Sequence, residues 1–221
     1  MSLHKKVVIL GAGGHGRVIA DNLMAMIDNG SLFEFAGFAD ETFPKDTHID
    51  DGIVLGRDTD LASLKKAGIA DHFIVGVGSV RGGDALRSKI FNTALKAGLM
   101  PVSVIHPSAV ISCRVEVGRG CAIMAGTVIN TGARIGDNSI INTRASVDHD
   151  THIGAHVHIA PGCVLSGDID IGDNVLVGVG TSIIQGVRIG ANATIGAGST
   201  VVKSVKPDTV VFGPRARVTS E

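Results

Sequence analysis

His149 stands between two acids, in the stretch Val147-Asp148-His149-Asp150, and this grouping could perform acid–base chemistry. An exposed imidazole beside carboxylates gains basicity and can serve as a general base. Eighteen residues further along lies Gly167, whose bare main-chain N–H could stabilise an oxyanion if the two positions stack. A base beside an exposed amide is the minimum set for acyl transfer. The alternative is a surface histidine in a loop.

A six-residue repeat must position these residues. From Ile105 to Val201, every sixth residue is Ile, Leu or Val, at seventeen positions without interruption. Neither an α-helix nor a simple alternating strand has this period, whereas a hexapeptide period is typical of a parallel β-helix with inward aliphatic residues. Three hexads form one triangular coil, so residues eighteen apart stack on coils about 4.8 Å apart. His149 comes two residues after an inward aliphatic residue and is expected to point outward.

A second group capable of chemistry is the glycine run Gly11-Ala12-Gly13-Gly14-His15-Gly16, which matches G-x-G-x-x-G between a strand and a helix. Such a turn lets the backbone approach a phosphate at the helix N-terminus, and Asp40, at the end of the second strand, could bind a ribose hydroxyl. The same loop could merely turn tightly. A region of about a hundred residues is short for a complete dinucleotide fold, so a mononucleotide fits better than NAD.

Strands and helices alternate through this first region, which predicts a parallel sheet with crossover helices. We expect strands at residues 6–10, 35–39, 53–55, 73–77 and 102–105, and helices over residues 17–27, 60–67 and 84–97. Six of the seven phenylalanines precede residue 105. The sequence therefore predicts two domains, a small Rossmann-like α/β domain at residues 1–104 and a β-helix at 105–206, followed by a tail at 207–221.

His152, His156 and His158 lie just downstream of His149 and raise the question of a zinc site. Tetrahedral zinc needs convergent ligands, whereas these three positions fall on different parts of the coil. We therefore expect no metal site.

Composition narrows the functional classes. The net charge is −1 with mixed signs, so nucleic acid and anionic membranes are not expected partners. No apolar run approaches the roughly 18 residues of a membrane-spanning helix, and the N-terminus lacks a secretory signal pattern. The odd number of cysteines, Cys113, Cys121 and Cys163, favours a reducing, cytoplasmic compartment, with the last two as compact core residues.

Several of these motifs together resemble one family. They are the Gly11–Gly16 run, the segment Ile105-His106-Pro107-Ser108-Ala109, and Ile141-Asn142-Thr143 continuing to Val147-Asp148-His149-Asp150. The chain resembles the NeuD-like sugar O- and N-acetyltransferases over essentially its whole length. It looks closest to the N-acetyltransferases of nucleotide-linked 4-amino sugars, of the bacillosamine and perosamine type.

The resemblance implies a left-handed β-helix that forms a homotrimer and binds acetyl-CoA between neighbouring helices. It implies His149 as general base, Asp150 as its acidic partner, and direct attack of the sugar amine on the thioester. Asn142 would lie in the active site, and His158 and the Gly167 amide would contact the thioester. The remaining residues implied are, for the nucleotide, Gly13, Gly14, His15 and Asp40, and for the coenzyme phosphates, Arg215.

Two segments depart from the family pattern. The stretch Ser79–Asp84 is longer than the corresponding loop of many relatives, which leaves the role of Arg87 open, and the tail Gly213–Arg217 carries its proline one place early. Three alternatives to amino-sugar N-acetylation also stay open. They are O-acetylation of a sialic acid, a zinc hydratase of the carbonic-anhydrase type, and a non-catalytic solenoid that binds nucleotides.

Overall fold

The structure is a computed structural model that describes residues 5–213. Its N-terminal part is a six-stranded sheet in the order β3-β4-β2-β1-β5-β6. All neighbours pair in parallel except β3 and β4, which form an antiparallel hairpin. The strands are β1 (Lys5–Leu10), β2 (Phe33–Ala39), β3 (His48–Ile49), β4 (Gly52–Gly56), β5 (His72–Val75) and β6 (Met100–Pro101). The predicted mixture of parallel strands and crossover helices is confirmed.

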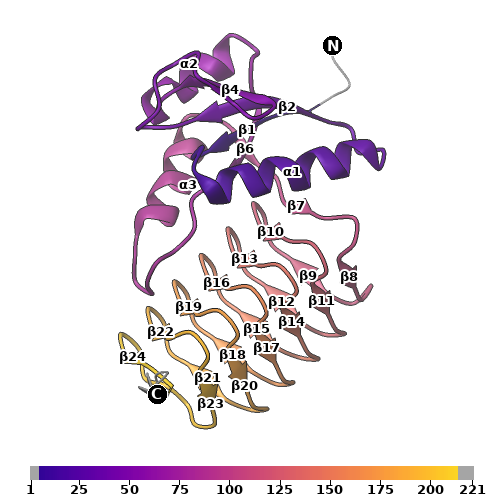
Figure 1. Ribbon diagram of the computed structural model, residues 1–221, viewed down its shortest axis with the longest axis vertical. Coiled ribbons are helices and arrows are strands. Elements are labelled where there is room, and N and C mark those ends of the chain that lie inside the picture. The colour runs from indigo at the N-terminus through magenta and orange to yellow at the C-terminus, as the bar shows by residue number, and fades with distance from the viewer. Residues whose placement is uncertain (1–4, 214–221) are drawn as a thin grey trace, which may run out of the picture.

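Helices cover both faces of this sheet, and one of them also covers the β-helix. The helices are α1 (Gly14–Asp28), η1 (Asp58–Asp60), α2 (Leu61–Lys66) and α3 (Leu86–Lys96). Side chains of β1 alternate between the two faces, as a pleated strand requires. Val7 and Ile9 pack with α1, whereas Val8 and Leu10 pack with α2 and α3. Figure 1 shows α1 lying between the sheet and the β-helix.

The helix α1 starts at Gly14, three residues before the start expected from the sequence. Gly13 is the N-cap in an extended conformation, and Gly16 packs so closely on the backbone of Gly11 and Gly76 that no Cβ would fit. The glycine run therefore brings His15 into the first helical turn and presses the helix onto the ends of β1 and β5.

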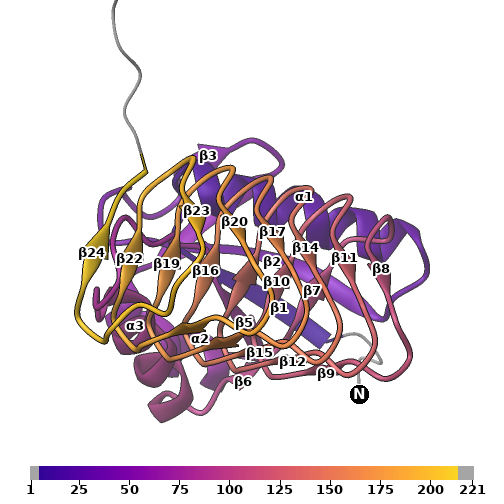
Figure 2. The ribbon, with the colours of Figure 1, turned by 90° about the horizontal axis from the view of Figure 1, so that it is seen from below.

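Residues 104–211 form a β-helix of short parallel strands in three walls. In Figure 2 its coils follow one another from β8 at the right to β24 at the left. The first wall holds β7 (Val104–Ile105), β10 (Ala122–Ile123), β13 (Ile140–Ile141), β16 (His158–Ile159), β19 (Leu176–Val177), β22 (Thr194–Ile195) and β24 (Val210–Val211). The second wall holds β8 (Val110–Ile111), β11 (Val128–Ile129), β14 (Ser146–Val147), β17 (Val164–Leu165), β20 (Ser182–Ile183) and β23 (Thr200–Val201). The third wall holds β9 (Glu116–Val117), β12 (Arg134–Ile135), β15 (His152–Ile153), β18 (Asp170–Ile171) and β21 (Arg188–Ile189).

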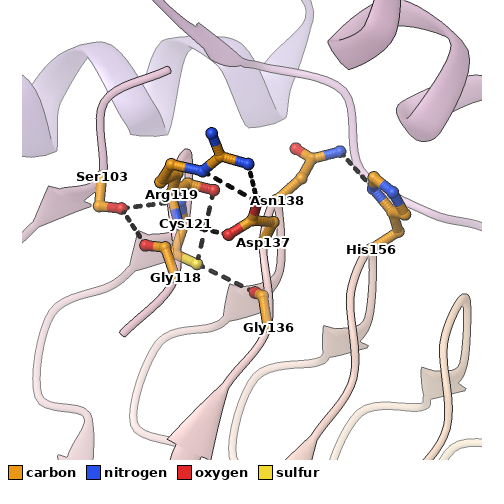
Figure 3. Close-up of polar contacts among 8 residues, drawn as sticks. All are labelled: Ser103, Gly118, Arg119, Cys121, Gly136, Asp137, Asn138 and His156. Atoms are coloured by element: carbon orange, nitrogen blue, oxygen red, sulfur yellow. Dashed lines mark hydrogen bonds and ion pairs between the residues drawn. The ribbon is translucent and has the colours of Figure 1, made fainter. Parts of the chain in front are cut away.

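The predicted β-helix with stacked hexads is confirmed by the register of these strands. Residues eighteen apart are paired, as in Ser146 with Val164, and the aliphatic repeat fills the interior. Several small side chains inside the coil add a second ladder, because they donate to a carbonyl fifteen residues later. Cys121 Sγ lies 3.2 Å from the Gly136 oxygen and Ser139 Oγ lies 2.8 Å from the Gly154 oxygen, the former visible in Figure 3.

We call the edge between the first and second walls the first corner, that between the second and third walls the second corner, and that between the third and first walls the third corner. The corners turn at residues with positive φ, such as Asn138 at 55° and Asp150 at 56°. Asn and Asp tolerate this conformation better than other side chains.

The N-terminal domain covers the first wall. Ile140 points out of the coil yet is fully buried, because it packs in one cluster with Ile19 and Leu23 of α1. The β-helix also runs past the expected boundary at residue 206, since β24 pairs with β22 sixteen residues earlier and closes a shorter last coil. The predicted start of the tail at residue 207 is therefore too early.

Candidate active site

His149 occupies the second corner, immediately after β14. Its Nδ1 lies 2.9 Å from Oδ2 of Asp150, and its backbone N–H donates to Oδ1 of Asp148 at 2.7 Å. Asn130, one coil earlier, donates to the same oxygen of Asp148 at 2.7 Å. These contacts hold the corner and the ring together in one arrangement.

The neighbouring acids suit His149 to accept a proton. When Nδ1–H donates to Asp150, the lone pair of the neutral ring lies on Nε2. The hydrogen bond to Asp150 raises the pKa of His149, and the negative charges of Asp148 and Asp168 raise it further. The side chain is 45% exposed, so an incoming substrate can reach it.

Gly167 lies on the next coil directly against this ring. A Cβ placed at Gly167 would come within 2.5 Å of Cε1 and 2.9 Å of Cδ2 of His149, and closer still to Nε2. Among residues 5–213, the N–H of Gly167 has no hydrogen-bond acceptor. The corner therefore presents a basic nitrogen and a free main-chain donor side by side.

The pairing with Asp150 predicts a specific pH response. A general base must be neutral, so turnover should rise with pH through the raised pKa of His149. Asp150→Asn removes the main cause of that elevation and also weakens the preference for the Nδ1–H tautomer. We expect the acidic limb of the kcat profile to move to lower pH and the plateau to fall roughly 10-fold.

Asp168→Asn provides the matched control for this measurement. It removes a nearby negative charge but leaves the contact between Nδ1 and Asp150. We expect it to move the acidic limb in the same direction without lowering the plateau. An acidic limb that stays in place in Asp150→Asn would show that His149 is not the group that titrates.

A second group of polar residues lies between the two domains, next to the first corner. Asn142 follows β13, and its Nδ2 lies 3.1 Å from Nε2 of His158 on β16. The ring of His158 lies 6.0 Å from the ring of His15 in α1. Burial lowers the pKa of His15 to about 3, and the charges of Arg87 and His158 lower it in the same direction. Burial also lowers the pKa of His158 to about 4, with the charge of Arg87 as a further cause. Both rings are neutral at pH 7.

The open end of α1 borders this group. Gly13 and Gly14 are exposed, and a Cβ at either position would meet nothing within 4 Å. The N-cap carries no side-chain hydrogen bond and the first turn holds no acid. Free N–H groups and the positive end of the helix dipole thus face open space, as an anion-binding site requires.

The sequence predicts that His15 and Asp40 face the nucleotide, but in the structure both side chains make contacts within the protein. His15 is turned toward His158 between the domains. The Asp40 carboxylate accepts from the backbone N–H groups of Ala12 at 2.7 Å, Thr42 at 2.7 Å and Phe43 at 3.1 Å. Asp40 therefore ties the glycine run to the segment after β2.

The residues implied for the site fall into two groups that one chain does not bring together. His149, Asp150 and Gly167 lie at the second corner, whereas Asn142 and His158 lie at and beside the first corner. The second wall separates these corners, because Asn142 precedes β14 and His149 follows it. Arg215 lies outside the described residues.

The three downstream histidines also separate. His152 is exposed on the third wall, and His156 packs at the third corner with its ring 5.8 Å from that of Phe91. His158 faces His15 on the first wall. Within residues 5–213, no group of three His, Cys, Asp or Glu side chains is placed to hold a metal ion. No helix in that range is long and apolar enough to cross a membrane.

Sequence reasoning left the roles of Arg87 and of the loop after Gly78 open. Arg87 is buried between the domains and donates to Asn138. The loop docks on the β-helix, because Gly82 N–H donates to Thr194 Oγ1 at 2.7 Å and Gly83 N–H to the Asn174 oxygen at 2.9 Å. The signal for Arg87 is its helical spacing, since it shares the buried face of α3 with Ile90, Phe91 and Ala94.

Comparison with protein families matches both domains. The family described as the PglD N-terminal domain matches residues 6–94. The bacterial transferase hexapeptide family, which comprises six repeats, matches residues 132–167 and 168–203.

Individual relatives agree with these matches. GDP-perosamine N-acetyltransferase from Escherichia coli is 31% identical to this chain over 104 residues. The match covers 47% of this chain and 45% of that relative, so it spans less than half of the relative's length. A histidine-to-alanine mutant of GDP-perosamine N-acetyltransferase from Caulobacter crescentus was solved with CoA and GDP-perosamine. It is 36% identical with a TM-score of 0.84, covering 98% of this chain and 97% of that one. The acetyltransferase domain of PglB from Neisseria gonorrhoeae, solved with acetyl coenzyme A, is 30% identical with a TM-score of 0.83, covering 95% and 97%.

Proposed function

This chain belongs to the PglD-type hexapeptide-repeat sugar N-acetyltransferases, and from that premise we propose that it transfers the acetyl group of acetyl-CoA to the amine of a nucleotide-linked 4-amino-deoxy sugar. The observation that carries the proposal is the His149–Asp150 pair with its free Nε2 against Gly167. It supplies a general base next to a main-chain donor at an exposed corner.

The reaction is a single displacement. His149 Nε2 takes the proton that the sugar ammonium carries, and the freed lone pair attacks the thioester carbon. The imidazolium is stabilised by the hydrogen bond from Nδ1 to Asp150, and the N–H of Gly167 donates to the developing oxyanion. The C–N bond forms, the C–S bond breaks, and the thiolate of CoA receives the second proton lost by nitrogen.

No cysteine has a part in this scheme. Burial raises the pKa of the Cys121 thiol to about 11 and also raises that of Cys163. Both thiols donate to carbonyls inside the coil, so neither is a nucleophile.

We propose that the active enzyme is a homotrimer, because the two groups of site residues lie at opposite edges of one wall. If three second walls face a common axis, the second corner of each protomer meets the first corner of its neighbour. His149 would then join Asn142 and His158 of the next chain, with acetyl-CoA between them. The wall is apolar enough to be an interface, with Val110, Val128 and Val164 37–64% exposed.

The trimer is tested by analytical ultracentrifugation. We expect the protein to sediment at the mass of three 22.6-kDa chains, and a monomer with full activity would contradict the proposal.

Acetyl transfer itself is tested by following release of the CoA thiol. Nucleotide-linked 4-amino sugars carrying GDP, UDP and dTDP are the substrates, with GDP-perosamine first because two relatives are named for it. Free sialic acid is the competing acceptor. Thiol release with a 4-amino sugar, matched by an N-acetyl product in the mass spectrum, supports the proposal. Release with sialic acid alone would overturn it.

Substitution of Gly14, at the N-terminal end of α1, is expected to have opposite effects on stability and on nucleotide binding. Gly14→Ala adds a methyl group where it meets no protein atom, and alanine favours the helix by up to about 1 kcal/mol. The same methyl would occupy space beside the N–H groups proposed to hold the diphosphate. We expect an unchanged or higher Tm, with KM for the nucleotide sugar raised roughly 10-fold.

The control for Gly14→Ala is the KM for acetyl-CoA, which should not change. An unchanged KM for the nucleotide sugar would place the diphosphate elsewhere.

A cytoplasmic location is proposed as well, because all three cysteines are free thiols.

A further inference from the structure

The loop between β5 and α3 attaches the N-terminal domain to the later coils of the β-helix, and we call its residues 79–84 the docked loop. The backbone N–H of Gly82 donates to Oγ1 of Thr194 on β22 at 2.7 Å. The backbone N–H of Gly83 donates to the oxygen of Asn174, which precedes β19, at 2.9 Å. In Figure 1 this segment, which leads into α3, extends from the N-terminal domain toward the coils of β19 and β22.

The contact at Gly82 is one of backbone against backbone. A Cβ at this position would overlap the carbonyl oxygen of Ala193 and come within 2.5 Å of the carbonyl carbon. Gly82 does not have positive φ, so the close approach, and not the turn, requires a glycine here. Together with the hydrogen bond to Thr194, this approach fixes the height of the docked loop above the first wall.

A second attachment of the N-terminal domain is α1, which lies along the earlier coils. In its last turn, Sδ of Met26 lies 3.1 Å from the backbone nitrogen of Ile105 on β7. In its first turn, the ring of His15 lies 6.0 Å from that of His158 on β16. The apolar face of α1 packs on β7, β10 and β13. The N-terminal end of the helix therefore extends beyond the coils on which the helix packs.

The proposed substrate would bridge the two domains at this extended end. Its diphosphate would bind the free N–H groups of α1, whereas its amine must reach the corner beside Asn142 and His158. The sugar fixes the distance between the two groups, so the end of α1 must stay at one height above the first wall. The hydrogen bond from Arg87 to Asn138 falls on the coil of β13, before this end. The docked loop reaches β22, three coils or about 14 Å further along the axis.

We propose that Gly82 and Thr194 are positioning residues for acetyl transfer, because the docked loop holds the N-terminal end of α1 at the height at which the sugar amine meets the thioester. The inference rests on the proposed function, since this height matters only if the substrate spans the two domains. Neither residue touches acetyl-CoA or the nucleotide sugar in this scheme. Both act through the docking of one domain on the other.

Two variants loosen the docked loop from opposite sides. Gly82→Ala introduces a methyl group that overlaps Ala193, so the loop must lift. Thr194→Val keeps the shape of the side chain and suits a strand, but it removes the acceptor for the N–H of Gly82. Val80→Ala is the matched control, since Val80 lies in the same loop and is 85% exposed.

Kinetics and binding separate positioning from a loss of binding or of folding. The acceptor is the nucleotide-linked sugar that the wild type turns over, and the binding probe is its nucleoside diphosphate, such as GDP for GDP-perosamine. We expect Gly82→Ala to lower kcat roughly 20-fold, since misplacement of a reacting group by about 1 Å can cost about 10²-fold. Thr194→Val, which removes one hydrogen bond, should lower kcat roughly 5-fold. The Kd for the nucleoside diphosphate and the KM for acetyl-CoA should not change, and Val80→Ala should behave as the wild type.

Hydrogen exchange of the full chain, followed by mass spectrometry, reports on the docked loop itself. The amides of Gly82 and Gly83 are hydrogen-bonded, so peptides that contain them should be protected in the wild type. Both loosened variants should exchange these amides roughly 10-fold faster. Peptides from α1 should exchange as in the wild type, because the helix keeps its own packing. Val80→Ala should change neither set of peptides.

Faster exchange of the docked loop with an unchanged kcat would overturn the proposal. So would exchange that stays the same in both variants, or a kcat that falls together with the affinity for the nucleoside diphosphate. If Gly82→Ala does not fold, Thr194→Val decides the question, because it leaves the backbone contacts of the loop in place. If the wild type acetylates no amino sugar, the proposed function fails and this proposal with it. A failure of this proposal alone would leave acetylation intact in both variants.

Discussion

Replacement of His149 by alanine is expected to lower kcat roughly 10²–10⁴-fold, the range that loss of a general base usually costs. The ring carries the free Nε2 at the second corner, and its Nδ1 is occupied by Asp150 at 2.9 Å. The side chain is 45% exposed and fills no core position, so the Tm should change little. Steady-state rates of CoA thiol release, with acetyl-CoA saturating, give the comparison.

His152→Ala is the matched control for this variant. His152 is also exposed, and it lies on the third wall, one residue before the next inward aliphatic residue. Its loss should leave kcat within about 2-fold of the wild type, as expected of a surface position without a special role. Near-normal turnover of His149→Ala, with the same sedimentation as the wild type, would remove His149 from the mechanism.

The β-helix could be predicted in detail because its chemistry is periodic. An inward aliphatic residue every sixth position allows only one way of stacking, and residues such as Ser146 and Val164 pair as the eighteen-residue spacing requires. The direction in which His149 points follows from the same count. The hexad pattern does not show which wall the other domain covers, since Ile140 and Val128 are equivalent outward residues by sequence. Only α1, packed against the first wall, makes Ile140 buried and leaves Val128 exposed.

The part of the site between the domains could not be predicted, because it depends on contacts distant in sequence. Arg87 meets Asn138 fifty-one residues later, and Ser79 meets His158 seventy-nine residues later. A local pattern marks Arg87 only as an arginine on an apolar helix face. The glycine run was recognisable, yet the orientation of His15 toward His158 depends on how α1 docks on the β-helix.

Gly167→Ala is expected to lower kcat roughly 10²-fold while the fold is retained. The added methyl would come within 2.5 Å of Cε1 of His149 and closer to Nε2, so the ring must move. Gly167 does not have positive φ, so alanine brings no backbone strain of that kind. Because the ring is exposed, it can turn into solvent at little cost in stability, but a shift of about 1 Å in a reacting group can cost about 10²-fold in rate. Measurements of kcat and Tm on the same preparation test both expectations.

The double variant His149→Ala/Gly167→Ala identifies the cause of this loss. Without the imidazole, the methyl at position 167 has no ring to displace, and the main-chain N–H is still present. Gly167→Ala should then cost no more than about 2-fold beyond His149→Ala alone, since the two effects share one mechanism. If the full loss recurred in the double variant, the methyl would act on the oxyanion or on acetyl-CoA instead. Such a result would separate the donor role of Gly167 from the placement of His149, which the single variant alone cannot do.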